Sequence, residues 1–235
     1  MAHIDSDLTI LALDTCTESC SAALLHNQDL HCRSANAPRE HSQRLLPMVD
    51  EVLKEANIKI ADVNLIAYGR GPGSFTGIRI CTSMTQGLAL GHDIPVIGIS
   101  TLAAMAQMVI DTDSAKQVFV AIDARMNEIY WGQFTNSDGI ATLVGEEHVS
   151  TPEQVNILLD TEQTITLCGT GFDAYPDLLS NLDSTQMSDI KLPDAKAMLT
   201  LAQLGYKQGL STPVDELAPV YLRDTVTWKK LPGRE

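Results

Sequence analysis

The chain has 235 residues, of which 44% are hydrophobic, and its 30 acidic and 16 basic residues give a formal net charge of −14. Such a length allows one large domain or two moderate ones, and such a charge argues against a chain that grips a nucleic-acid backbone alone. Five cysteines without framework spacing predict reduced thiols in a cytosolic protein. The polar N-terminal residues and the short apolar runs predict neither a signal peptide nor a membrane-spanning helix.

The first part of the chain predicts an alternation of strands and helices. Strands are expected at residues 8–13, 19–25, 30–34, 63–68 and 94–99. Helices are expected at residues 41–56, from 74 or 76 to about 91, and, capped by Ser100 and Thr101, up to 110. Pro47 lies inside the apolar stripe of the first helix, and it predicts either a kink or the point where the regular helix begins.

A polar break at residues 111–116 predicts a boundary between two lobes, because the pattern restarts after it. Strands are then expected at residues 118–122, 128–134, 140–149 and 164–167. Helices are expected to open at 151–153 and to occupy 172–179 and 194–205, followed by a linker (209–219), a short extended segment (220–223) and a loose tail (229–235). Strand-strand-strand-helix-strand therefore occurs twice, which divides the chain into an N-terminal lobe (1–110), a C-terminal lobe (111–210) and a C-terminal segment (211–235).

The most distinctive stretch is Tyr68-Gly-Arg-Gly-Pro-Gly-Ser-Phe-Thr-Gly-Ile-Arg79. A strand, a glycine turn and a helix N-terminus are typical of ligand-facing elements, because glycine permits close approach and the free N–H groups at a helix start favour an anion. The glycine spacing fits neither the phosphate loop nor the dinucleotide-binding fingerprint. A turn that binds nothing is the alternative.

Three small residues recur at four-residue steps on the helix that follows this turn: Ser83, Gly87 and Gly91. They therefore line one face, where another helix can pack closely. The neighbouring helix belongs either to the same chain or to a partner chain. Arg79, Gln86 and His92, within or beside the run, exclude a membrane span.

Several motifs together resemble the bacterial TsaB (YeaZ) family over nearly the whole chain. They are Leu13-Asp-Thr15, the helix start His41–Pro47, the string Gly71–Arg79, Ile122-Asp-Ala-Arg-Met126 with Glu128 and Tyr130, and Pro219-Val-Tyr-Leu-Arg223. The resemblance implies an α/β, actin-like (ASKHA) fold of two tandem ribonuclease-H-like lobes. It also implies a non-catalytic subunit that binds the related catalytic subunit TsaD, with a TsaE-type ATPase, for threonylcarbamoylation of adenosine 37 in tRNAs that read codons starting with A.

The residues of a nucleotide cleft are largely missing. In actin-like ATPases a glycine after the first Asp lets backbone N–H groups reach phosphate, whereas this chain has Asp14-Thr-Cys16 and, in the second lobe, Asp123-Ala-Arg125. Gly169-Thr-Gly171 resembles an adenosine-binding turn, but the helix at 100–108 has no His, Asp or Glu, and no protease motif is present. We therefore expect no catalytic, cofactor-binding or metal-binding residues. An actin-like ATPase or phosphotransferase with a degenerate phosphate loop is the alternative.

The remaining conspicuous residues are interpreted as a partner interface formed by the first two helices. They are His41, Leu45, Met48, Val52, Ser74, Phe75, Arg79, Ser83, Gly87 and Gly91. An exposed aromatic side chain such as Phe75 is costly unless a partner covers it, and Arg79 on the first helical turn calls for a carboxylate. The alternatives are that the helices cover their own sheet, that Phe75 packs under the turn, and that His41 serves as a cap.

The expected partners are the TsaD-type subunit in a heterodimer and the TsaE-type ATPase. Alone, the chain is expected to form a homodimer through the same two helices, and it is expected to meet tRNA only indirectly, through the complex. A self-associating regulator without a link to tRNA is a further alternative.

Overall fold

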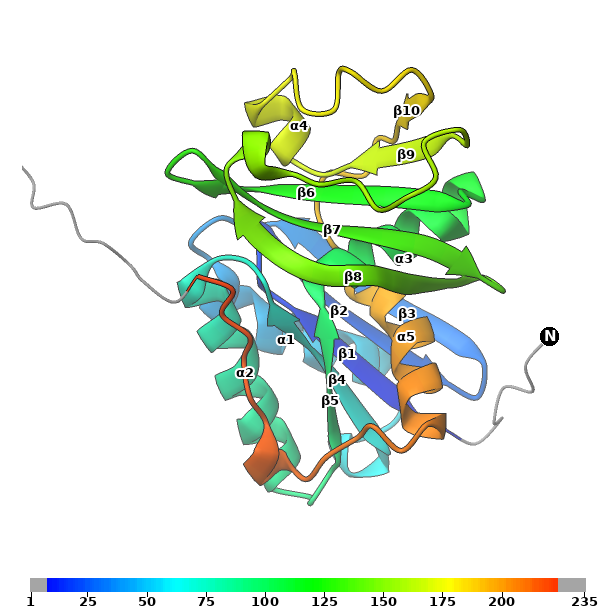
Figure 1. Cartoon of the computed structure of the whole chain (residues 1–235). Helices are drawn as coiled ribbons and strands as arrows, with labels where there is room; N and C mark the ends of the chain where they lie inside the picture. Colours follow the sequence, from blue (N-terminus) through cyan, green and yellow to red (C-terminus); the bar gives the residue numbers. More distant parts are fainter. Residues whose placement is uncertain (1–7, 224–235) are drawn as a thin grey trace, which may run out of the picture.

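A computed structural model describes residues 8–223 and arranges them in two stacked α/β lobes (Figure 1). Each lobe is built on one five-stranded mixed sheet. The first sheet has the order β3-β2-β1-β4-β5 and consists of β1 (Ile10–Asp14), β2 (Ser19–His26), β3 (Asp29–Asn36), β4 (Leu65–Gly71) and β5 (Val96–Ser100). The second sheet has the order β10-β9-β6-β7-β8 and consists of β6 (Gln117–Arg125), β7 (Glu128–Ser137), β8 (Ile140–Ser150), β9 (Ile165–Cys168) and β10 (Thr185–Met187).

Both sheets follow the same pairing rule. The first three strands of each lobe form antiparallel hairpins, and a later strand then pairs in parallel with the first strand. Ile10 of β1 lies opposite Leu65 of β4, and Gln117 of β6 lies opposite Ile165 of β9. This repeated order confirms the expected actin-like architecture of two tandem ribonuclease-H-like lobes.

The described residues form five α-helices: α1 (His41–Glu55), α2 (Phe75–Leu90), α3 (Thr101–Asp113), α4 (Gly171–Ala174) and α5 (Ala195–Lys207). Local sequence signals explain where three of them begin. Ser74, Ser100 and Asp194 each accept a hydrogen bond from a backbone N–H of the first turn of α2, α3 and α5. α1 begins six residues before Pro47 and continues through it, so the proline does not mark the helix start.

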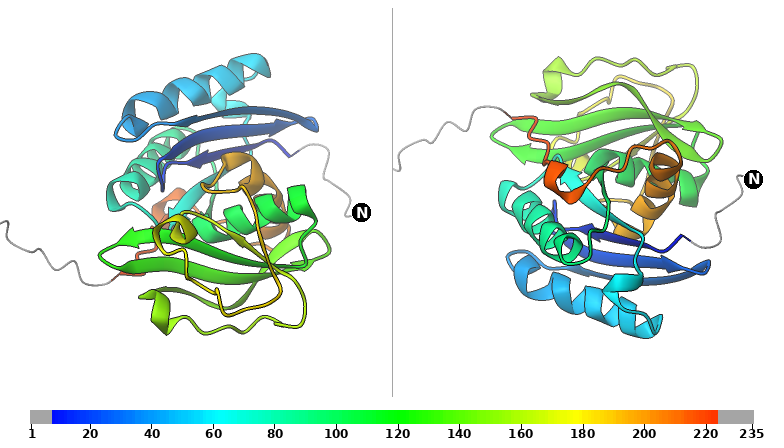
Figure 2. Two further views of the ribbon diagram at one scale, coloured as in Figure 1. Left: turned by 90° about the horizontal axis from the view of Figure 1, so that it is seen from above. Right: turned by 90° about the horizontal axis from the view of Figure 1, so that it is seen from below.

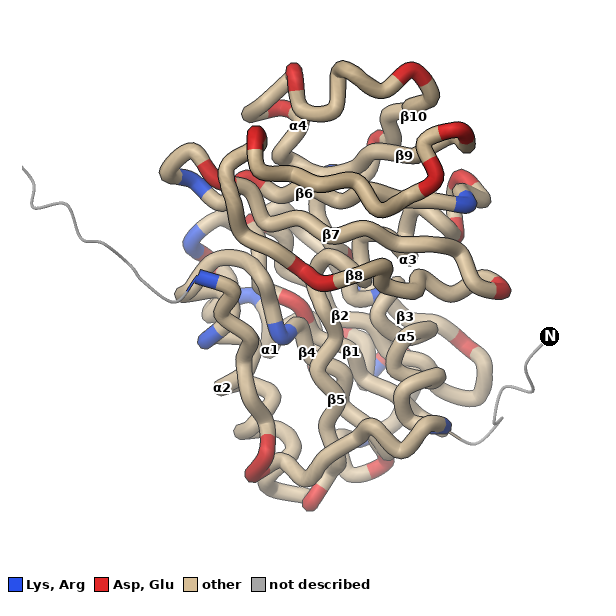
Figure 3. The backbone as a smooth tube through the Cα atoms, viewed as in Figure 1, with Lys and Arg blue, Asp and Glu red and all other residues tan. Residues whose placement is uncertain are grey.

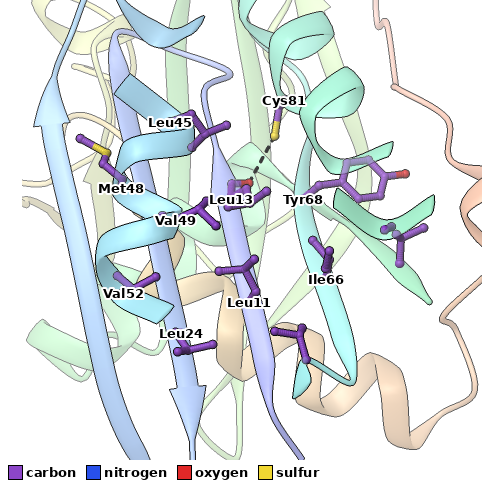
Figure 4. Packing of buried hydrophobic residues seen from close by; sticks show 14 of the residues in the cluster. Leu11, Leu13, Leu24, Leu45, Met48, Val49, Val52, Ile66, Tyr68 and Cys81 are labelled. Atoms are coloured by element: carbon purple, nitrogen blue, oxygen red, sulfur yellow. Dashed lines mark hydrogen bonds between the residues drawn. The ribbon is translucent and has the colours of Figure 1, made fainter. Parts of the chain in front are cut away.

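The first sheet is covered on both faces. α1 and α2 pack on one face, where the buried side chains include Leu11, Leu13, Leu24, Leu45, Met48, Val49, Val52 and Ile66 (Figure 4). α5 covers the other face, where Met198 and Leu199 share a cluster with Ile10 and Leu65. Because both faces of β1 are buried, its sequence is a continuous apolar run instead of an alternating one.

The helices α3 and α5 lie between the two sheets and join the lobes (Figure 2). Met105 and Val109 of α3 are buried in one cluster with Val118 and Phe134 of the second sheet. The division of the chain at residues 110 and 210 stays a prediction. However, α5 falls within 111–210 and packs on the first sheet. The core of the first lobe is therefore built from two separate stretches of the chain.

The second lobe lacks the helix that the repeat predicted after its third strand. Residues 151–153 open only a 3₁₀ turn, η2 (Pro152–Gln154), and the chain then runs extended. The reason is that Val155, Ile157 and Leu159 pack on the core at every second position, which suits an extended chain and not a helix.

Smaller differences concern the ends of elements. The helix expected at 172–179 is limited to α4. The strand β10 and the 3₁₀ turns η1 (Ile60–Asp62) and η3 (Val214–Glu216) have no counterpart among the predicted elements. The tail expected at 229–235 lies outside the described residues.

Candidate partner-binding surface

The glycines between β4 and α2 pack against the turn between β1 and β2. A Cβ atom at Gly73 would overlap the carbonyl oxygen of Cys16, and a Cβ atom at Gly77 would overlap that of Thr15. Two hydrogen bonds fix this contact: the Ser74 N–H donates to the Cys16 carbonyl at 2.7 Å, and the Thr15 hydroxyl donates to the Gly77 carbonyl at 2.7 Å. Close packing of the two turns therefore accounts for these glycines.

Asp14 ends β1 beside this contact, and its carboxyl group is fully buried. Oδ1 accepts a hydrogen bond from the Cys16 N–H at 3.0 Å, whereas Oδ2 has no hydrogen-bond partner among residues 8–223. A side chain at Gly69 would overlap Oδ2. Burial raises the pKa of Asp14 from 3.8 to about 7, and the hydrogen bonds from Cys16 offset this only in part.

Asp123, at the corresponding place in the second lobe, makes the same kind of turn. Its Oδ1 accepts a hydrogen bond from the Arg125 N–H at 2.9 Å, and its Oδ2 pairs with the Arg125 guanidinium at 2.9 Å. Side chains at Gly169 and Gly171 would overlap or crowd Ala121, so close packing also accounts for the glycines that resembled an adenosine-binding turn. In each lobe, an aspartate carboxylate accepts the hydrogen bond of a backbone N–H group in this turn. In a phosphate loop, such N–H groups would point at the phosphate instead.

A cavity of about 380 Å³ lies between the two turns. Its charged lining residues are Glu18, Asp123, Arg125 and Arg223, two of each sign. Arg125 spans the cavity to Glu18 at 3.6 Å, in addition to its bond to Asp123. A triphosphate calls for an excess of positive charge, which this lining does not supply.

The structure corrects the expected role of the α1 residues. Leu45, Met48 and Val52 belong to the core of the first lobe and are buried against its sheet (Figure 4). His41 is also buried, and it is the first residue of α1 and not its cap. These four side chains are not accessible to a partner, because the helix uses its apolar stripe to cover its own sheet.

The α2 residues lie differently. Ser83, Gly87 and Gly91 are exposed, and a Cβ atom at Gly87 or Gly91 would have no atom within 4 Å. Ser74 is exposed too and caps the helix by accepting from the Gly77 N–H at 3.3 Å. The small-residue face of α2 is therefore not covered by another described part of the chain.

Phe75 and Arg79 form the end of this face. The ring of Phe75 is 51% exposed, and the Arg79 guanidinium carbon lies 3.8 Å from its centre. Among the described residues, no carboxylate forms an ion pair with Arg79. The Arg79 Nε lies 3.5 Å from the Tyr221 hydroxyl. A hollow of about 400 Å³ follows the helix here, lined by Phe75, Thr76, Arg79, Ile80, Ser83 and Met84.

Three exposed residues, on α1, on α2 and in the C-terminal segment, were missed by the sequence interpretation. Leu90 is 62% exposed at the end of α2, Leu46 is 45% exposed on α1, and the Tyr221 ring lies tilted against Phe75 with 5.5 Å between ring centres. The helical period places Leu46 outside the buried stripe of α1, and this could have indicated from the sequence that Leu46 is exposed. Tyr221 is far away in sequence, and no local pattern indicates its contact.

The described residues contain no group of three or more His, Cys, Asp or Glu that could hold a metal ion. Cys16, Cys20, Cys81 and Cys168 are buried, and burial raises the pKa of the Cys20 thiol to about 11. Within residues 8–223, no helix is long and apolar enough to cross a membrane.

Comparison with known proteins decides the family. A family model described as "TsaD: tRNA N6-adenosine threonylcarbamoyltransferase" matches residues 33–231. The tRNA threonylcarbamoyladenosine biosynthesis protein TsaB of Haemophilus influenzae is 45% identical, over 97% of this chain and 99% of the relative. The TsaB protein of Escherichia coli is 43% identical, over 97% of this chain and 100% of the relative. The chain belongs to the TsaB family.

A solved structure agrees with this assignment. YeaZ from Pseudomonas aeruginosa superposes with a TM-score of 0.86 at 40% identity, covering 92% of this chain and 100% of that one. The resemblance to the TsaB (YeaZ) family is thereby confirmed. Because the family model carries the name of TsaD, this TsaB-family chain is also similar to a transferase, and its own role has to be argued from its surface and its cleft.

Proposed function

We propose that this TsaB-family chain is a non-catalytic scaffold subunit that binds a TsaD-type catalytic subunit. Together with a TsaE-type ATPase, the pair would carry out threonylcarbamoylation of tRNA in the cytosol. The observation that carries the proposal is the open face of α2, where Ser83, Gly87 and Gly91 lie in a row with no covering residue of the described chain.

The dimensions and chemistry of this face suit a partner helix. Phe75 and Leu90 are exposed at its two ends, about 22 Å apart along the helix axis. Between them, the small residues allow a second backbone to approach closely. Exposed apolar side chains at both ends of such a face are typical of an interaction surface, because water solvates them poorly.

The cleft supports a non-catalytic role. The Asp14 carboxyl group is enclosed in the core, and the Asp123 carboxylate is taken by Arg125. Neither group is therefore placed to hold a metal–nucleotide complex or to move a proton on a substrate. In the proposed complex, the chemistry belongs to the TsaD-type partner.

The charge distribution supports an indirect contact with tRNA. Several Lys and Arg residues lie where the ends of α1 and α2 approach the second lobe (Figure 3). Arg44 pairs with Glu40 at 2.6 Å, and Arg70 pairs with Glu147 at 3.2 Å. Because such groups neutralise the chain's own carboxylates and the net charge is −14, we expect the partner to supply most phosphate contacts.

The test is co-purification with the TsaD-type chain of the same organism, followed by light scattering. Ser83→Trp and Gly87→Trp add bulk to the open face, and we expect them to abolish pairing while the isolated chain stays folded. Thr112→Trp, at an exposed position near the end of α3, is the matched control and should pair normally. Unchanged pairing of the two α2 variants would show that α2 is not the contact.

The same variants test the homodimer. If the isolated chain associates through α2, light scattering should report a dimer for the unaltered chain and for Thr112→Trp, and a monomer for Ser83→Trp and Gly87→Trp. A dimer in all four samples would place self-association on another surface.

Two further measurements separate the alternatives. Calorimetric titration with ATP and Mg²⁺ is expected to show no micromolar binding, whereas binding with turnover by the isolated chain would favour an actin-like ATPase. Depletion of the chain in cells is expected to remove threonylcarbamoyladenosine from bulk tRNA, measured by mass spectrometry. An unchanged nucleoside level would favour a regulator without a link to tRNA.

A further inference from the structure

Residues Ala218–Arg223, which we call the strap, run along α2 from the first lobe to the second (Figure 1). At its first end the strap is bound to β4. The Tyr68 hydroxyl donates to the Ala218 carbonyl at 3.2 Å, and the Val220 N–H donates to the Arg70 carbonyl at 2.8 Å. A Cβ atom at Gly71 would lie 2.8 Å from the Val220 carbonyl oxygen, so the strap fits closely against this strand.

At its other end the strap is bound to the turn between β6 and β7. The Arg223 guanidinium forms an ion pair with Glu128, with Nε donating at 3.0 Å, and it also donates to the Ala124 carbonyl at 3.1 Å. The guanidinium carbon lies 5.9 Å from the centre of the Tyr130 ring. Since the Arg223 side chain is 19% exposed, this pair is better shielded from water than an ordinary surface ion pair.

Between these two anchors, the strap contacts the exposed end of α2. The Tyr221 ring lies 5.5 Å from the Phe75 ring, and the Tyr221 hydroxyl lies 3.5 Å from Arg79 Nε. Val220 and Arg223 are three positions apart in the chain, a separation that spans at most about 11 Å. The backbone that carries Tyr221 is therefore held on both sides within a short distance along the chain.

From these contacts, we infer that the strap couples the spacing of the two lobes to the partner-facing end of α2. A movement of the β6–β7 turn away from β4 pulls Arg223, and the short strap transmits this to Tyr221 and so to Phe75. Tyr221 and Arg223 are positioning residues in this arrangement. The coupling rests on the geometry alone, and its consequence for partner affinity rests on the proposed function.

Amide hydrogen exchange of the isolated chain tests the coupling. Arg223→Ala releases the second anchor, and we expect faster exchange both in residues 123–128 and in residues 78–82 of α2. A purely local role of Arg223 predicts a change in residues 123–128 alone, and that result would overturn the coupling. The unfolding midpoint of each variant, measured in urea, shows whether it remains folded under the exchange conditions.

Three further variants make the test specific. Tyr221→Ala keeps the Arg223 anchor and should speed exchange in residues 78–82 only, whereas Tyr221→Phe keeps the ring and should leave it unchanged. Exchange of the two charges, Arg223→Glu with Glu128→Arg, should slow exchange in both segments relative to Arg223→Ala, although only in part, because a glutamate at 223 cannot donate to the Ala124 carbonyl. Failure of the charge exchange to slow the α2 segment would contradict a coupling through this ion pair.

Partner binding gives the second readout. Among the described residues, the hydrogen bonds and the ion pair of Arg223 are made with the β6–β7 region and not with α2. Arg223→Ala is nevertheless expected to weaken binding of the TsaD-type partner about tenfold, equivalent to about 1.4 kcal/mol. If both segments respond in hydrogen exchange while affinity is unchanged, the positioning role is overturned and the strap only holds the lobes. The α2 variants Ser83→Trp and Gly87→Trp separately decide whether α2 is the contact.

Discussion

Gly73 and Gly87 are both glycines of the same turn-and-helix unit, but their surroundings are opposite. A side chain at Gly73 would overlap the Cys16 carbonyl, whereas one at Gly87 would meet no atom within 4 Å. We therefore expect Gly73→Ala to lower the free energy of unfolding by about 1–3 kcal/mol, because the two turns must move apart. Gly87→Ala should raise it by about 0.5–1 kcal/mol, because alanine favours the helix.

Urea unfolding of both variants measures these changes, and each serves as the control for the other. The conclusion that close packing accounts for Gly73 requires that the two substitutions change the free energy of unfolding in opposite directions. A Gly73→Ala chain as stable as the unaltered one would mean that the turn has room for a side chain, and a ligand role for the string would have to be reconsidered.

Asp14 gives a pH dependence with a definite sign. Its pKa is about 7 in the folded chain against 3.8 as the ordinary value, so the folded state holds the proton more tightly. The stability from this group is fully present below pH 4 and is lost as the pH rises through about 7. The negative charge of Asp194 adds to the effect of burial in raising the pKa of Asp14, whereas the hydrogen bonds with Cys16 lower it.

Asp14→Asn removes this titration while keeping the acceptor for the Cys16 N–H. We expect the variant to gain free energy of unfolding relative to the unaltered chain between pH 4 and 7, by at most about 4 kcal/mol, with a constant difference above that range. Urea unfolding across the pH series measures it. A difference that does not change with pH would show that Asp14 is ionised throughout.

At the level of elements, α1 has neighbouring leucines with opposite roles. Leu45 is fully buried against the first sheet, and Leu46 is 45% exposed. Leu45→Ala should cost about 2–5 kcal/mol of unfolding free energy through the cavity it leaves, whereas Leu46→Ala should cost less than about 0.5 kcal/mol. Thermal or urea unfolding checks this, and equal costs would contradict the placement of the stripe. If α1 contributes to partner binding, the contribution then has to come from Leu46 and its exposed neighbours.

The elements with a capping residue and an apolar period could be predicted from the sequence. Ser74, Ser100 and Asp194 cap helices that were expected at those places. The helix expected at 151–153 shows the limit of this approach: its proline and acid are valid start signals, but the following apolar residues repeat every second position. Tertiary packing of that segment on the core outweighs the local start signal.

The partner surface was predictable only in part, for a related reason. An apolar stripe shows that one face of a helix is covered, but it does not show whether the cover is the same chain or another. For α1 the cover is its own sheet, while the small-residue face of α2 is open. The contact of Tyr221 with Phe75 joins residues far apart in sequence, so only the three-dimensional structure brings it into view.

On the scale of the whole molecule, the two lobes share their cores and their polar contacts. Glu147 of β8 is largely buried and accepts hydrogen bonds from Arg70 of β4 and from Ser100, which also caps α3. α5, which follows the second sheet in the chain, covers one face of the first sheet. The lobes are therefore expected to unfold together in one cooperative transition.

This interleaving predicts how fragments behave. A fragment of residues 1–116 leaves Ile10 and Leu65 without α5, and leaves Met105 of α3 without the second sheet. We expect it to lack a dispersed proton NMR spectrum by itself and to gain one when mixed with residues 117–235. As a control, a full chain cut after folding at a protease site placed beside Ser114, an exposed residue, should keep the native spectrum. A cooperatively folded 1–116 fragment would instead show that the boundary at residue 110 separates two independent domains, because the first sheet would then be stable with one face uncovered.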